Sequence, residues 1–91
     1  MKTIVAGSRG IADYEVVLAA IRQSGFEVTE VVSGTARGVD KLGERYAIEN
    51  VIPITRFVPD WDKHGKRAGY LRNTEMGDYA DALIAVWDGE S

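Results

Sequence analysis

Two patterns of hydrophobic positions alternate along the chain, and each predicts a different element. Short runs that are apolar throughout and rich in β-branched residues are typical of buried strands. Such runs occupy Thr3–Ala6, Val28–Val32, Ile52–Val58 and Leu83–Trp87. The segments between them are predicted to be helical, from Tyr14 to Ile21, from Val39 to Ala47 and from Lys66 to about Gly77. Asp13 and Gly25 suit the start and the end of the first helix.

The order of these elements, β-α-β-α-β-α-β, predicts an α/β fold. Strands that alternate with helices and are apolar throughout form parallel sheets covered by helices, and their crossovers are right-handed. We expect a three-layer sandwich with three helices and a four-stranded parallel sheet in the order 3-2-1-4. Residues 1–91 contain no linker, repeat or low-complexity segment, so we expect a single domain.

Glycine-containing loops follow the first, second and fourth predicted strands, at Gly7–Gly10, Ser33–Gly38 and Asp88–Ser91. In the expected sheet these strand ends lie side by side, at the edge where parallel α/β sheets bind ligands. Close backbone approach, hydroxyl donors and arginine together suit a phosphate. The predicted ligand-binding residues here are Gly7, Ser8, Arg9, Ser33, Gly34, Thr35, Ala36, Arg37, Gly38 and Asp40. The alternative is that the loops are plain turns, with Arg37 solvated and Asp40 complementing only the helix N-terminus.

The third predicted helix and the segment before it add further candidate contacts. Four residues spaced four, three and four apart share one helix face, namely Gly65, Gly69, Arg72 and Met76. We expect Gly69 to leave room for a ligand, which Arg72 and Asn73 contact. Close packing against a neighbouring element is the alternative. Trp61 either covers the base of a nucleotide or packs on a helix.

Composition and charge narrow the function classes. The 91 residues carry a net charge of −3, which argues against sequence-blind binding of nucleic acid. The chain has no cysteine and one histidine, so we expect neither a metal site nor a bound cofactor. The G-x-G-x-x-G and G-x-x-x-x-G-K-[ST] patterns are absent, which excludes an ordinary dehydrogenase or P-loop ATPase. The N-terminal apolar run is too short for a signal peptide or a membrane span, so we expect a cytoplasmic protein without a membrane partner.

A single basic cluster contains Lys63, His64, Lys66, Arg67 and Arg72, with Trp61 and Tyr70 beside it. Basic side chains with aromatic neighbours bind single-stranded nucleic acid by charge and stacking. Asp60 and Asp62 lie in the same segment, and the net charge is negative. Nucleic acid is therefore a less favoured partner than a small nucleotide-derived molecule.

Three stretches resemble the SLOG superfamily of Rossmann-like domains, and most closely its YspA/YpsA-related branch. They are "GSRG", "SGTARGVDKLGERYA" and "WDKHGKRAGYLRNTEMGDYADALIAVWDG", which together cover nearly the whole chain. The resemblance implies a Rossmann-like fold and a nucleotide-derived ligand. It also implies that Gly34, Thr35, Ala36 and Gly38 occupy the superfamily's phosphate-loop positions.

Two better-understood relatives extend this resemblance. "SGTARGVD" is similar to a motif of DNA-processing protein A, which binds single-stranded DNA. "RNTEMGDYADALIAV" resembles the stretch of the LONELY GUY phosphoribohydrolases that carries their catalytic arginine. That family cleaves the N-glycosidic bond of nucleoside monophosphates, so the resemblance implies that Arg72 is catalytic if this chain is an enzyme.

The sequence departs from the phosphoribohydrolases after the fourth strand. Their strand leads into a Pro-Gly-Gly-x-Gly-Thr-x-x-Glu loop and helix with a catalytic Glu, whereas this sequence ends at Ser91. We therefore expect a domain without the C-terminal helix and fifth strand. Asp40, Glu75 and Glu90 are the remaining candidate carboxylates, and none of them matches the family position.

These considerations favour binding or sensing of a nucleotide-derived ligand over catalysis. Hydrolysis of a nucleotide N-glycosidic bond is the alternative, and binding of single-stranded DNA is the second alternative. The missing helix would leave an apolar face of the sheet uncovered, and such faces are usually covered by partners. We therefore also expect a homodimer through the third helix or the fourth strand.

Overall fold

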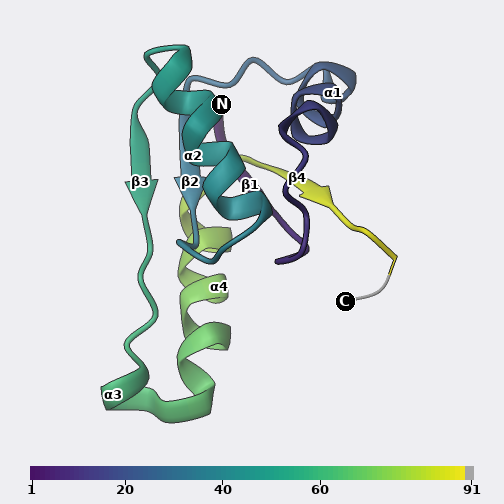
Figure 1. The fold of residues 1–91 in the computed structure, drawn as a ribbon. Coiled ribbons are helices and arrows are strands. Elements are labelled where there is room, and N and C mark those ends of the chain that lie inside the picture. The colour runs from purple at the N-terminus through teal and green to yellow at the C-terminus, as the bar shows by residue number, and fades with distance from the viewer. Residues whose placement is uncertain (90–91) are drawn as a thin grey trace.

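A computed structural model of the chain describes residues 1–89 and has the architecture that the sequence predicts (Figure 1). The elements follow in the order β1 (Lys2–Gly7), α1 (Tyr14–Ser24), β2 (Glu30–Ser33), α2 (Val39–Glu49), β3 (Ile54–Arg56), α3 (Trp61–His64), the 3-10 turn η1 (Gly65–Arg67), α4 (Ala68–Tyr79) and β4 (Ala82–Val86). The four strands form one parallel sheet in the order β3-β2-β1-β4. The predicted α/β fold and strand order are confirmed.

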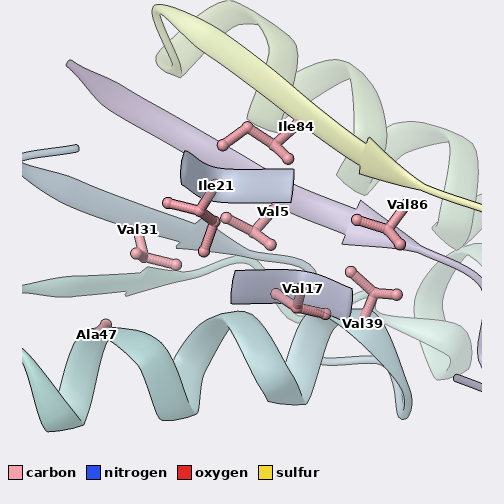
Figure 2. Close-up of a cluster of buried hydrophobic side chains, with 8 residues drawn as sticks. All are labelled: Val5, Val17, Ile21, Val31, Val39, Ala47, Ile84 and Val86. Atoms are coloured by element: carbon pink, nitrogen blue, oxygen red, sulfur yellow. The ribbon is translucent and has the colours of Figure 1, made fainter. Parts of the chain in front are cut away.

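Helices cover both faces of the sheet. In Figure 1, α1 and α2 lie in front of the strands and α4 lies behind them. The main core lies between the sheet and the first two helices (Figure 2), and it consists of Val5, Val17, Ile21, Val31, Val39, Ala47, Ile84 and Val86. On the other face, α4 buries Ala68 and Met76. The arrangement is the three-layer sandwich expected from the sequence.

The ends of α1 follow the predicted signals. The Asp13 side chain accepts a hydrogen bond from the Glu15 amide at 3.0 Å and so caps the first turn. Gly25 has a φ of 71°, the left-handed conformation with which many helices end. On α2, Gly43 allows the helix to approach the sheet closely, because a Cβ there would lie 2.8 Å from the Val5 Cβ.

Several elements differ from their predicted limits, and the structure explains two of these differences. Strand β3 ends at Arg56, although the apolar run continues to Val58. Within residues 1–89 its partner in the sheet is β2, which ends at Ser33 opposite Arg56, so the pairing stops there. The third predicted helix is preceded by two short elements, α3 and η1. The Asp60 side chain caps the start of α3, because it accepts a hydrogen bond from the Lys63 amide at 3.1 Å.

Gly65 corrects one prediction about the third helix. It has a φ of 58° and lies between α3 and α4, so it does not share a helix face with Gly69, Arg72 and Met76. The other three residues lie on α4 as expected. None of the helices in residues 1–89 is long and apolar enough to cross a membrane.

Candidate functional site

Ser8 joins the three loops at the carboxyl edge of the sheet. Its amide donates to the Val86 carbonyl at 2.9 Å, and its carbonyl accepts from the Val39 amide at 3.3 Å. Its hydroxyl oxygen accepts from the Asp88 amide at 3.0 Å. The ends of β1 and β4 and the start of α2 therefore meet at one buried serine, as the predicted strand order requires.

The loop between β2 and α2, residues 34–38, has a constrained backbone. Thr35 has a φ of 66°, which is unusual for a β-branched residue and costs about 1–3 kcal/mol. Gly38 has a φ of 79°, and a Cβ there would lie 2.4 Å from the Ser8 carbonyl oxygen, so this position requires glycine. Such strained backbone concentrates at functional sites.

Side chains beneath the loop hold this conformation. The Ser33 hydroxyl oxygen accepts from the Thr35 amide at 3.1 Å, and the hydroxyl donates to the Glu44 carboxylate at 2.5 Å. Arg56 Nε donates to the other Glu44 oxygen at 3.1 Å. The Glu44 side chain is 7% exposed, so these bonds compensate a buried charge. The Ser33 side chain is therefore buried and supports the loop.

Arg72 reaches the loop from α4. Its Nη1 donates to the Gly34 carbonyl, and its Nε donates to Asn73 Oδ1 at 2.8 Å. A Cβ on Gly34 would lie 2.8 Å from Asp40 Oδ2 and 3.0 Å from Arg72 Nη1. The missing side chain at Gly34 thus allows a carboxylate and a guanidinium to approach the same point of the backbone.

The loop and the start of α4 enclose an open cleft of about 410 Å³. In Figure 1 the N-terminal half of α4 extends past the carboxyl ends of the strands, with α3 at its far end. The cleft is lined by Arg9, Gly34, Thr35, Ala36, Arg37, Val58, Pro59, Trp61 and Arg72. Trp61 packs over Gly69, since its Cη2 lies 3.5 Å from where a Cβ on Gly69 would be. Trp61 therefore both packs on a helix and lines the cleft.

A smaller chamber of about 190 Å³ adjoins this cleft, and Arg9, Gly34, Ala36 and Arg72 line both spaces. The remaining lining residues of the inner chamber are Ala6, Gly7, Asp40, Asn73 and Met76. Asp40 is 5% exposed. Burial raises the pKa of its carboxyl group, against the opposing effects of the Ala36 amide, Arg72 and Arg9. The site thus combines three arginines with one nearly buried acid.

The structure brings most of the predicted site residues together. Those that line the cleft or the inner chamber are Gly7, Arg9, Gly34, Thr35, Ala36, Arg37, Asp40, Trp61, Arg72 and Asn73. Four others lie behind this surface, namely Ser8, Ser33, Gly38 and Gly69, which hold or shape the loops and α4. Glu90 and Ser91, which the sequence placed in the third loop, lie outside the described residues.

Sequence reasoning missed several residues of the site. Val58 and Pro59 line the cleft, Ala6 and Met76 line the inner chamber, and Glu44 supports the loop from below. Glu44 stands four residues after Asp40, so the helical spacing alone could have placed both acids on one face of α2. Within residues 1–89 there is no group of three or more histidine or acidic side chains that could hold a metal ion.

Comparisons with known proteins identify the family of the chain. Residues 1–64 match the model of a family described as YspA, cpYpsA-related SLOG. The gene 61 protein of Mycobacterium phage D29 is 46% identical over 52 residues, a match that covers 50% of this chain and 41% of that protein. The matched part thus spans less than half the length of this relative. No solved structure shows significant similarity to the chain.

Proposed function

Since the chain belongs to the YspA, cpYpsA-related SLOG family, we propose that its cleft binds or senses a nucleotide or a nucleotide-derived ligand. The observation that carries the proposal is the convergence of Arg9, Arg37 and Arg72 on a cleft of about 410 Å³ in a protein of net charge −3. Positive side chains gathered in one cleft of an acidic protein favour a small anion over an extended polyanion.

The phosphate of such a ligand fits the β2–α2 loop. Arg9 and Arg37 are exposed at the cleft and supply fork-shaped, charged donors. Within residues 1–89 the amides of Arg37 and Gly38 donate to no protein acceptor. These amides precede α2, whose N-terminus adds a partial positive charge.

The base of the ligand fits the outer wall of the cleft. Val58, Pro59 and Trp61 form an apolar side opposite the loop. The Cη2 atom of Trp61 lies beside Gly69 and the residue remains 53% exposed, so much of the ring surface is accessible for stacking. Stacking of a base on an aromatic ring contributes about 1–3 kcal/mol.

Hydrolysis of a nucleotide N-glycosidic bond is a second candidate function, and one observation favours it. Asp40 and Arg72 line the same inner chamber, which places a carboxylate and a guanidinium on one small space. Cleavage of this bond uses an acid or base together with an anchoring cation. Release of adenine from AMP by the wild-type protein, abolished by Arg72→Ala, would establish this activity.

Calorimetric titration tests the proposed binding function. We expect saturable binding of at least one of AMP, ADP-ribose, NAD and a cyclic dinucleotide. Arg37→Ala should weaken that binding about tenfold or more, since charged hydrogen bonds contribute about 1.5–3 kcal/mol each. Arg22→Ala is the matched control, because Arg22 is exposed on α1 and does not line the cleft.

Two outcomes would contradict the proposal. The first is the absence of heat from the whole panel with a wild-type protein whose circular dichroism spectrum is that of a folded α/β domain. The second is an equal loss of binding in Arg37→Ala and Arg22→Ala, which would show that the ligand does not bind in the cleft.

A further inference from the structure

The inner chamber differs in character from the outer cleft. Its volume of about 190 Å³ is less than half that of the cleft, and it lies toward β1 and the middle of α4. Ala6 and Met76 supply an apolar wall, while Asp40 and Asn73 supply polar atoms. A space with one apolar and one polar side suits a sugar ring, which has a face of C–H groups and a rim of hydroxyl groups.

Asp40 has an acceptor atom that the protein does not use. Its Oδ2 accepts from the Ala36 amide at 3.1 Å, whereas Oδ1 has no hydrogen-bond partner within residues 1–89. None of the fully enclosed side-chain oxygen or nitrogen atoms in this part of the chain lacks a partner. Oδ1 is therefore not fully enclosed, and the inner chamber is the space that Asp40 lines.

Asn73 adds the complementary donors. Its Oδ1 is occupied by Arg72 Nε at 2.8 Å, which orients the side-chain amide and leaves its NH₂ group free. The chamber therefore presents one carboxylate acceptor and one amide donor. Two adjacent hydroxyl groups, each able to donate and accept, match that pair.

We propose that the inner chamber is a ribose subsite, in which Asp40 accepts a hydrogen bond from the cis-diol of the ligand and so selects ribonucleotides over deoxyribonucleotides. The inference rests on the proposed function and deepens it, because it names the part of the nucleotide that enters the inner chamber. A buried acceptor discriminates strongly against an analogue that lacks the hydroxyl group, since the acceptor is then left unpaired.

Titration of the full chain with AMP, 2′-deoxy-AMP and 3′-deoxy-AMP tests this subsite. We expect the wild-type protein to bind AMP about tenfold or more tightly than the weaker of the two deoxy analogues. Asp40→Asn keeps an oxygen for the Ala36 amide but removes the negative charge. This variant should show a smaller preference for AMP over the weaker analogue than the wild-type protein does, since an NH₂ group in place of Oδ1 cannot accept from a hydroxyl group.

Asp78→Asn is the matched control, since Asp78 is exposed on α4 and lines neither cavity. It should keep the wild-type preference. Equal binding of the three nucleotides by the wild-type protein would overturn the ribose subsite and leave the proposed function standing. An equal loss of affinity for all three nucleotides in Asp40→Asn would also overturn the ribose subsite, because it would indicate a merely structural role for Asp40. Failure of the wild-type protein to bind any of the three would overturn the subsite, and failure with the whole calorimetric panel would overturn the proposed function as well.

Discussion

Gly34 shows how a single residue sets the character of this site. It lacks a side chain, and the Asp40 carboxylate and the Arg72 guanidinium occupy the space around it. The glycine, the acid and the arginine were each predicted as site residues from the sequence, because loop position and residue type were visible there. Their mutual contact was not visible, since Arg72 comes from an element 38 residues further along the chain.

The buried charge on Asp40 should cost stability at neutral pH. Burial raises the pKa of Asp40 above its value in the unfolded chain, so the folded protein binds that proton more tightly. The cost is therefore present above the folded pKa and absent below the unfolded pKa. We expect Asp40→Asn to have a higher free energy of unfolding than the wild-type protein near pH 7, and the same value near pH 3.

Urea denaturation at the two pH values measures this difference, with Asp78→Asn as the control. A lower free energy of unfolding for Asp40→Asn near pH 7 would mean that Asp40 stabilises the fold through its charge. That result would contradict the view that the protein retains the Asp40 carboxylate for ligand binding at a cost in stability.

Contacts between elements explain which parts of the fold the sequence could predict. Caps and apolar spacing are local, so α1, α2 and most of α4 were predicted correctly. The length of β3 was not, because it depends on where β2 ends in the adjacent strand. Glu44 was missed for a similar reason, since its role requires Ser33 from β2 and Arg56 from β3 at the same point.

The C-terminal end of α4 is attached to the amino end of the sheet, far from the cleft. The Tyr79 hydroxyl donates to the Glu30 carboxylate, which also accepts from Thr55 at 2.8 Å. Both hydrogen bonds lower the pKa of Glu30, and the bond from Tyr79 has the larger effect. A lowered pKa contributes stability above the unfolded pKa, and the contribution is lost as the pH falls through the folded pKa.

Tyr79→Phe should therefore lower the free energy of unfolding by about 1 kcal/mol near pH 7, and by less near pH 3. Because Glu30 begins β2 and the cleft lies at its other end, nucleotide affinity should not change. Chemical denaturation and calorimetry of the same variant measure both quantities. A loss of affinity would show that the attachment of α4 at this end also positions Arg72.

At the scale of the whole molecule, the sheet is covered unequally. Between α4 and β4 lies a mainly apolar hollow of about 420 Å³, lined by Ile4, Ala6, Gly7, Asn73, Met76, Gly77, Leu83 and Ala85. Leu83 is 56% exposed, and β4 is an edge strand of the sheet in the described chain. An uncovered apolar face was expected from the sequence, and in residues 1–89 α4 lies on this side of the sheet while α1 and α2 lie on the other.

We propose that a second copy of the chain covers this face, with β4 pairing along its free edge. Light scattering at tens of micromolar should then give the mass of a dimer. Leu83→Arg should give a monomer, since a charge on this face opposes burial. Val51→Arg is the matched control, because Val51 is 92% exposed just after the end of α2 and does not line this hollow. A monomeric wild-type protein would contradict the proposal.

The most direct test of the central claim is to map amide chemical shifts in the ¹⁵N-labelled protein during titration with the tightest ligand of the calorimetric panel. We predict saturable shifts at the amides of residues 34–38, at the Trp61 indole and at Asn73, with little change at β4 or α1. That result would place the ligand between the β2–α2 loop and α4. Saturable shifts confined to the face around Leu83, or none in residues 34–38, would contradict a nucleotide site in the cleft.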